Sequence, residues 1–249
     1  MEAWKLALTF SGSFAAGYVG SMLGLVLGTL RLPLIVAVSG SPLAAAGTNI
    51  AISAASAGAG TLRHAREGRV HWRVVAWMAP PSVVGAILGA AFADDVSERL
   101  LYTAIAAVLV WSGLDLVIRP VRPLARERLR LLPAVISGLG IGMLGGAVGV
   151  ILGSLRMPAL LRGVGLGIKR AAGTNLVVGF LLGVAGFAVH AGAVGVQWST
   201  LAAGLAGALP GGWFGAKATG RFDERALRLA LGAVLVVVGG AFAAQAALH

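Results

Sequence analysis

The chain repeats itself, and this internal duplication constrains its fold more than any other feature. Residues 24–33 read GLVLGTLRLP, and residues 149–158 read GVILGSLRMP, so that Arg31 matches Arg156. Further pairs follow in the same order: Thr48-Asn49 with Thr174-Asn175, His64 with His190, Trp72 with Trp198, and Gly85 with Gly211. Agreement of this extent indicates two copies of one structural unit. We therefore divide the chain into an N-terminal repeat at 1–120, a basic cytoplasmic linker at 121–130 and a C-terminal repeat at 131–249.

The composition places both repeats in a membrane. Of the 249 residues, 58% are hydrophobic and only 12% are charged, whereas a soluble domain carries about 25% charged residues. The second apolar segment of each repeat is too short to cross about 30 Å of hydrocarbon as a helix. The apolar segments are 4–28, 32–39, 43–62, 73–93 and 98–118 in the first repeat, and 131–153, 157–166, 171–190, 197–216 and 226–247 in the second. We expect an all-α polytopic membrane protein.

The positions of the charged residues predict how the repeats are oriented. The net charge is +11, but the basic residues lie in short loops, as the positive-inside rule requires, so the charge does not indicate nucleic-acid binding. The loop at 63–73 holds four arginines, and its counterpart at 190–197 holds no Lys or Arg. The next pair of loops has the opposite bias. The repeats should therefore be inverted relative to each other in the membrane.

Inversion requires an odd number of crossings in each repeat. The simplest arrangement is a broken, re-entrant helical hairpin followed by three transmembrane helices. Five full crossings in each repeat would also preserve the inversion, and this alternative stays open.

Two arginines in apolar runs are the first candidates for a functional site. Each costs roughly 2.5–3.5 kcal/mol on insertion scales. We expect each to lie near a hairpin tip, beside the start of a short helix at Pro33 or Pro158, where free backbone N–H groups favour anions. The alternative is that both snorkel or satisfy backbone carbonyls. The predicted anion site, near the bilayer midplane, includes Arg31, Arg156, Thr29, Ser154, Gly28 and Gly153.

Other polar residues have more than one interpretation. Thr48, Asn49, Thr174 and Asn175 line the same cavity or join helices by hydrogen bonds. His64 and His190 could carry a proton, although a position at the membrane interface is the simpler interpretation. The chain has no cysteine and no nucleophile–base pair, metal-ligand spacing or carboxylate relay at membrane depth, so we predict neither an enzyme nor a cofactor. Gly-x-x-x-Gly patterns indicate close helix packing and leave a homodimer open.

Together these features resemble the TauE/SafE family, the sulfite and sulfonate exporter group of membrane transporters. The family pattern of spaced glycines and a proline, followed by Gly-Thr, is matched by residues 24–33 and 47–48 and again by 149–158 and 173–174. The chain departs from it at Val26-Leu27, at Ile151-Leu152, and at the two arginines. The resemblance implies export of sulfite or an organosulfonate through the cell's inner membrane. The alternatives are an anion-selective channel or a permease for another small anion.

Overall fold

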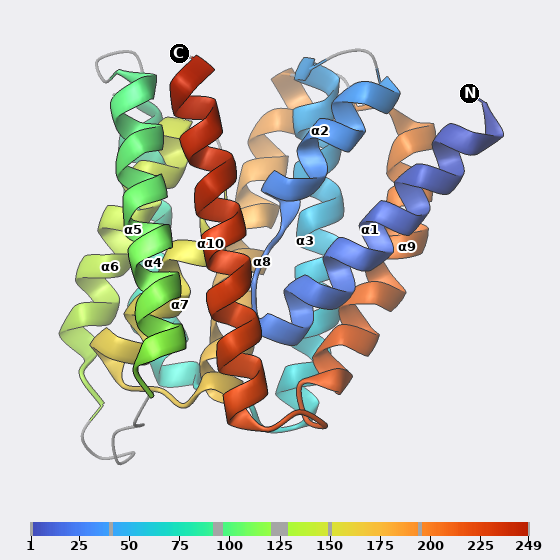
Figure 1. The fold of residues 1–249 in the computed structure, drawn as a ribbon. Coiled ribbons are helices and arrows are strands. Elements are labelled where there is room, and N and C mark those ends of the chain that lie inside the picture. Colours follow the sequence, from blue (N-terminus) through green and yellow to red (C-terminus); the bar gives the residue numbers. More distant parts are fainter. Residues whose placement is uncertain are drawn as a thin grey trace. The chain divides into compact units, whose positions relative to one another are not determined.

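The structure, a computed structural model, describes residues 2–39, 42–91, 97–120, 129–148, 151–193 and 196–248. These residues form helices joined by short connections (Figure 1). In chain order the helices are α1 (Ala3–Leu23), α2 (Gly28–Ser39), α3 (Pro42–Arg66), α4 (Trp72–Ala91), α5 (Glu98–Ile118), α6 (Leu131–Val148), α7 (Gly153–Pro158), the π-helix η3 (Ala159–Val164), α8 (Ile168–Ala193), α9 (Trp198–Ala218) and α10 (Glu224–Leu248). The predicted all-α fold is confirmed.

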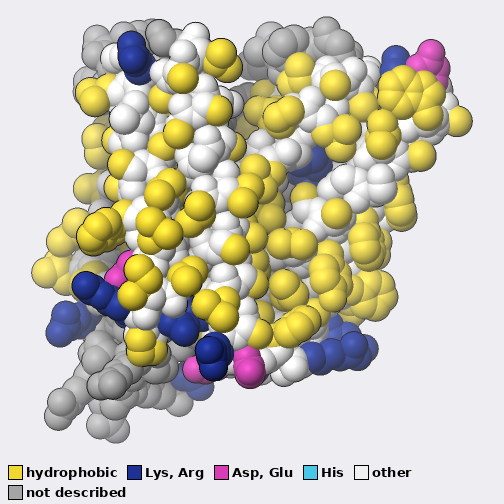
Figure 2. Space-filling view, in the orientation of Figure 1, with side chains coloured by type: hydrophobic (Ala, Val, Ile, Leu, Met, Phe, Trp, Pro, Cys, Tyr) yellow, Lys and Arg dark blue, Asp and Glu magenta, His cyan; other side chains and the backbone are white. Residues whose placement is uncertain are grey.

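The lengths and surfaces of these helices fit a multi-pass membrane protein. Among the described residues, α1, α4, α5, α8 and α10 contain stretches long and apolar enough to cross a membrane. Their outward faces carry large apolar side chains, such as Trp111 with 72% of its surface exposed. Figure 2 shows hydrophobic side chains along the helices and most Lys and Arg side chains toward helix ends. Lipid, rather than water, suits such surfaces.

Each repeat contains a hairpin followed by three long helices, as predicted. In the first hairpin, α1 ends at Gly24, whose φ of 75° is left-handed. A Cβ at this position would also collide with the backbone of Ala172, so only glycine fits. Residues 25–27 are not helical, and α2 then starts and returns antiparallel to α1, because Leu34 of α2 packs against Gly12 of α1.

The short helices do not start where the sequence predicted. We expected them to begin at Pro33 and Pro158, but α2 begins at Gly28 and α7 at Gly153. Each proline therefore lies at the sixth helical position, where it removes one backbone hydrogen bond that the rest of the helix must tolerate. As a consequence, Arg31 lies within the first turn of α2 rather than before the helix.

The helices form two compact units that cut across the sequence repeats. Unit 1 contains Met1–Val70 and Ala172–Arg221, and unit 2 contains His71–Ala171 and Phe222–His249. In unit 1, α1 packs against α9. In unit 2, α6 and α4, which are the repeat equivalents of α1 and α9, pack against each other. The repeat boundaries at 1–120 and 131–249 are defined by sequence similarity and stay a prediction, and residues 121–128 of the linker lie outside the described residues.

Glycines allow both equivalent helix pairs to pack backbone to backbone. In unit 1, a Cβ at each of three α9 glycines would collide with an α1 carbonyl, and the pairs, taken in order, are Gly207 with Phe10, Gly211 with Phe14, and Gly215 with Tyr18. Both residue numbers rise together, so α1 and α9 run parallel. In unit 2, Gly138 faces Met78 and Gly146 faces Ala86, so α6 and α4 also run parallel. The predicted role of the Gly-x-x-x-Gly patterns in helix packing is confirmed.

In unit 1, the ends of three helices meet among basic residues. The Arg69 guanidinium donates from Nη1 to the Ala216 carbonyl at 2.9 Å, which joins the α3 end to the α9 end. The Thr219 hydroxyl donates to the Met22 carbonyl at 2.8 Å, which adds the α1 end. We call this the basic end of unit 1, and its cationic residues are Arg63, Arg66, Arg69, Lys217 and Arg221.

Unit 2 has a basic end of its own, built from different helix termini. Arg162 of η3 donates to the Arg119 carbonyl at 2.9 Å, just past the α5 end. The Arg130 N–H donates to the Val164 carbonyl at 3.2 Å, which places the α6 start beside the η3 end. Arg228 near the α10 start donates to the Leu116 carbonyl of α5 at 2.9 Å. The ends of α5 and η3 and the starts of α6 and α10 therefore lie together.

Candidate functional site

Most of the predicted site residues lie in unit 1. It holds Gly28, Thr29, Arg31, Thr48, Asn49, Thr174, Asn175 and His64, whereas Gly153, Ser154 and Arg156 lie in unit 2. The side chain of His190 lies outside the described residues. The structure brings Arg31, Asn49 and Gly28 together in one cluster through hydrogen bonds of the Asn49 side chain.

Arg31 is buried and held by neutral partners. It is 4% exposed. Its Nε donates to the Asn49 Oδ1 at 2.9 Å, and its Nη2 donates to the Asn49 carbonyl at 3.1 Å and to the Ser53 Oγ at 2.7 Å. Asn49 and Ser53 lie one turn apart on α3, so a single helix face fixes the guanidinium. Its Nη1 donates no hydrogen bond to any residue that the structure describes.

Two asparagines, one from each Gly-Thr-Asn copy, hold the non-helical segment at 25–27. The Asn49 Nδ2 donates to the Gly28 carbonyl at 2.9 Å, and the Asn175 Nδ2 donates to the Gly24 carbonyl at 2.7 Å. Backbone outside a helix cannot rely on water inside a membrane, so its carbonyls need internal donors. Asn175 of the second repeat thus stabilises Gly24, the first residue of the arginine motif in the first repeat.

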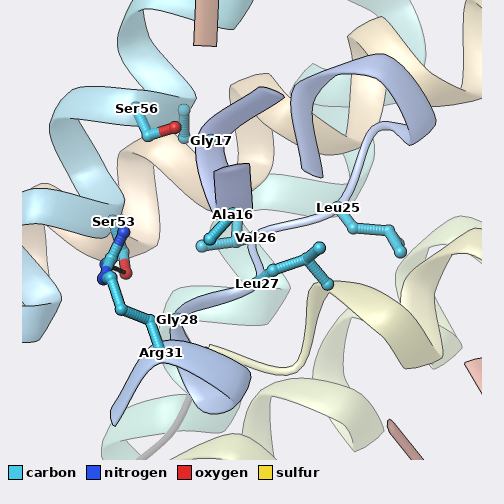
Figure 3. A pocket seen from close by; sticks show the side chains of 10 residues that line it. Ala16, Gly17, Leu25, Val26, Leu27, Gly28, Arg31, Ser53 and Ser56 are labelled. Carbon is cyan, nitrogen blue, oxygen red and sulfur yellow. Dashed lines mark hydrogen bonds between the residues drawn. The ribbon is translucent and has the colours of Figure 1, made fainter. Parts of the chain in front are cut away.

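A small pocket opens beside this cluster. The segment at 25–27 and Gly28 form one side, Ala16 and Gly17 of α1 another, and α3 the third (Figure 3). The α3 residues are Ser53, Ser56 and Ala57, and Arg31 completes the lining. The pocket lies at the α2 N-terminus, where the first N–H groups of a helix have no intrahelical acceptor and carry a partial positive charge.

No carboxylate compensates the Arg31 charge within the described part of the chain. The ion pairs there join Lys5 to Glu2, Arg63 and Arg69 to Glu67, and Arg119 and Arg162 to Asp115. All of these lie near helix ends, and none includes Arg31. A buried cation with only neutral partners is costly, and a bound anion would reduce that cost.

The second motif copy is also buried. Arg156 is 1% exposed and Ser154 is 7% exposed, both in the six-residue α7. The Gly153 N–H donates to the Ile151 carbonyl at 2.9 Å at the start of this helix. Both arginines are buried, so neither side chain snorkels, but Arg31 donates to the Asn49 carbonyl, so the alternative that the arginines satisfy backbone carbonyls stays open.

The remaining predicted residues lie around this cluster in different roles. The Thr48 hydroxyl donates to the Ala44 carbonyl at 2.7 Å and accepts from the Gln197 N–H at 3.2 Å, where α9 begins. The Thr48 hydroxyl therefore accepts from the Gln197 N–H at the start of α9. Thr48 is not among the residues that line the pocket. Thr29 is half-buried, and Thr174 is fully buried.

Two pocket residues, Ser53 and Ser56, were not predicted from the sequence. They follow Asn49 at four and seven residues, so the three share one face of α3. A polar stripe with this spacing in an apolar helix is a signal that could have identified them. His64 continues the same face two turns later and is fully buried. Its ring packs inside unit 1 in the last turn of α3, and its predicted position at the membrane interface stays a prediction.

A comparison with protein families now identifies the chain's relatives. The family model described as "Sulfite exporter TauE/SafE" matches residues 9–242. The chain belongs to this family. The TauE/SafE resemblance inferred from the motifs is thereby confirmed, and the chain is a multi-pass membrane transporter.

Individual relatives agree with this assignment. The "Probable membrane transporter protein YjnA" of Bacillus subtilis (strain 168) is 23% identical, and the match covers 94% of this chain and 98% of that protein. The "Probable membrane transporter protein YdhB" of the same organism is 25% identical over 91% of this chain and 90% of its own length. The "Probable membrane transporter protein ORF9" of Sinorhizobium sp is 28% identical over 78% and 75%. No solved structure matches the chain.

Proposed function

We propose that this TauE/SafE member transports a small sulfur oxyanion, such as sulfite or an organosulfonate, across the cell's inner membrane and binds it beside Arg31. The observation that carries the proposal is a buried guanidinium with neutral partners in a pocket at a helix N-terminus. The family description, which names sulfite, supports the class of anion.

The pocket offers the donors that an oxyanion requires. The Arg31 Nη1 donates to none of the described residues, and Ser53 and Ser56 supply hydroxyls. The Gly28 backbone adds the positive end of α2. Because Asn49 and Ser53 already fix the guanidinium plane, the anion would meet a preorganised donor and lose little affinity to side-chain ordering.

The helix directions support the inverted repeats that such a transporter would use. In unit 1, α1 and α9 end at the basic end, whereas in unit 2 their repeat equivalents α6 and α4 start on the side of its basic end. Likewise, α5 ends at the basic end of unit 2, and its repeat equivalent α10 starts at that same end. The positive-inside rule places both basic ends at the cytoplasm. Each helix and its equivalent would then cross the membrane in opposite directions.

This inversion can be tested because the chain has no cysteine of its own. Ser97 and Asp223 are repeat equivalents at the starts of α5 and α10, and both are exposed. We expect a membrane-impermeant maleimide to label Ser97→Cys from outside the cell and Asp223→Cys only after the membrane is opened. Labelling of both from the same side would refute the inversion.

The anion site is tested by sulfite binding and flux. Arg31→Ala should abolish sulfite-dependent thermal stabilisation and sulfite efflux from proteoliposomes. Arg66→Ala is the matched control, because it removes an exposed arginine of α3 near Trp213 and leaves the pocket intact. Normal efflux by a correctly inserted Arg31→Ala protein would exclude the site. Single-channel currents instead of saturable flux would favour the channel alternative.

A further inference from the structure

One buried ionisable side chain in unit 1, His64, has no role in the proposed anion site. It lies in the last turn of α3 and is 0% exposed. Its Nε2 lies 3.0 Å from the Ser21 carbonyl of α1. A carbonyl only accepts, so Nε2 carries the hydrogen, and Nδ1 of the neutral ring is the acceptor. That Nδ1 is buried and has no hydrogen-bond partner among the residues that the structure describes.

A row of small polar residues joins this ring to the anion pocket within unit 1. Ser53 and Ser56 line the pocket, and Ser56 faces Gly17 of α1, where an added Cβ would lie 2.9 Å from the Ser56 Oγ. One turn further, Ser21 of α1 faces Gly60 of α3, where an added Cβ would lie 2.6 Å from the Ser21 Oγ. The Ser21 carbonyl then contacts His64. Hydroxyls and bare glycine backbone therefore replace apolar side chains along the interface of α1 and α3.

We propose that His64 is a proton-binding residue of the transport cycle, which takes up a proton at Nδ1 and communicates with the Arg31 pocket through the serine row between α1 and α3. The inference rests on the proposed anion transport. In it, the proton arrives from the basic end and adds to the Nδ1 lone pair, so the ring becomes a cation. The proton leaves from the same atom, and no other bond changes.

Burial of the ring opposes an added positive charge, so the proton on His64 needs a compensating negative charge such as the bound anion. The charged groups close enough to act on the ring are Arg69, which opposes a positive ring, and Glu67, which favours one. These two are themselves paired, and Glu67 also accepts from Arg63 at 2.6 Å. Among the described residues of the facing elements, the Ser21 carbonyl on α1 and Gly173 on α8 contact His64.

The expected size of the coupling follows from the distance. His64 lies eleven residues beyond Ser53 on α3, about 16 Å along a helix. A cationic ring at that distance should strengthen binding of a singly charged anion on the order of fivefold, with an effective dielectric constant of about 20. Binding of the proton and binding of the anion would thus strengthen each other. The apolar segments hold no carboxylate relay, so such mutual strengthening is how this chain could couple anion transport to protons.

The test compares His64→Gln with His71→Gln, a matched control in the following loop. Glutamine can keep the donor to Ser21 but cannot titrate. Sulfite affinity is measured between pH 5 and 8 in detergent, and sulfite flux in proteoliposomes containing a pH-sensitive dye. Because sulfite itself titrates in this range, the quantity of interest is the difference between variants. We expect wild type and His71→Gln to gain about fivefold over His64→Gln on acidification and to move protons with sulfite.

The outcomes separate this inference from the anion site. If His64→Gln keeps the wild-type pH profile and proton movement while Arg31→Ala loses sulfite, His64 has no proton role and the anion site stands. If Arg31→Ala binds sulfite normally, the anion site fails. His64 is then judged by nitrogen-15 spectra of histidine-labelled protein in bilayers, assigned with His64→Gln. Protonation of Nδ1 within pH 5–8 supports the inference, and a ring that stays neutral overturns it.

Discussion

The two copies of the arginine motif have nearly the same sequence but do not form the same helix. The first copy continues as one α-helix, α2, from Gly28 to Ser39. The second forms a six-residue α-helix, α7, and then widens into the π-helix η3. The copies share the arginine and the proline, so these residues cannot cause the difference. The residues that follow each proline differ more, LIVAVS in one copy and ALLRGV in the other.

The end of η3 shows how those residues act. Gly165 has a φ of 90° and its N–H, like that of Leu166, donates to the Leu160 carbonyl, which closes the last turn at a wider spacing. Arg162 reaches the α5 end, where it donates to the carbonyls of Arg119 and Pro120 and pairs with Asp115 at 2.9 Å. The position equivalent to Arg162 in the first copy is Ala37, whose side chain can form no such bonds. The two copies therefore share the motif arginine but differ in how each hairpin is attached to its unit. We call the Arg162 contacts with the α5 end the tether of the second hairpin.

The largest expected effect comes from removing either motif arginine. Removing Arg31 leaves Asn49 and Ser53 without their donor and removes the pocket's charge, so we expect sulfite affinity to fall about 100-fold, or roughly 3 kcal/mol. Arg156→Ala, the equivalent change in the second copy, should cause a loss of similar size. Calorimetric titration of each variant measures this directly. Normal binding by Arg156→Ala would show that only the first copy contacts the anion.

Much of this architecture was predictable because duplication and loop charge carry long-range information. The hairpin before three long helices and the helix-end pair of Asp115 with Arg119 follow from local patterns. The π-helix was not predictable from the motif, because the first copy, with the same arginine and proline, continues as an α-helix. The role of Asn175 was equally hidden. Sequence equivalence predicts that it serves its own repeat, whereas its amide holds Gly24 in the other.

The next largest effect compares the equivalent helix pairs. A Cβ at Gly215 would collide with the Tyr18 carbonyl, and one at Gly89 with the Met143 carbonyl. Because backbone atoms cannot move aside as side chains do, we expect Gly215→Val and Gly89→Val each to destabilise the protein by about 3 kcal/mol. Gly240→Val is the control, since its Cβ would meet nothing. Thermal unfolding in detergent should show equal losses, and a loss in only one variant would mean that the two units differ in their dependence on these pairs.

A smaller effect should separate the two asparagines. Asn175→Leu leaves the buried Gly24 carbonyl without its donor, which should cost about 2 kcal/mol of stability and leave sulfite affinity within about threefold of wild type. Asn49→Leu removes the donor to Gly28 and also the support of Arg31, so it should lower both stability and affinity. Parallel unfolding and binding measurements test this division. Equal loss of affinity in both variants would mean that the shape of segment 25–27, rather than the Arg31 contacts, controls binding.

The smallest effect concerns the tether that the second hairpin has and the first lacks. Arg162→Ala gives the second hairpin the residue that the first has at this position, Ala37. It removes hydrogen bonds to the carbonyls at the α5 end, but the Arg162 side chain is 35% exposed and water can replace part of what is lost. We therefore expect a cost of about 1 kcal/mol in stability.

Hydrogen exchange shows whether this tether maintains the π-helix. Exchange of residues 159–164 should accelerate in Arg162→Ala, whereas exchange of the equivalent residues 34–39 in the first hairpin should not change. Arg225→Ala is the matched control, because it removes an exposed arginine near the α10 start of the same unit and leaves the tether in place. Unchanged exchange of residues 159–164 in Arg162→Ala would show that the π-helix is maintained by Gly165 and its own backbone, and that the tether follows from its shape rather than causing it.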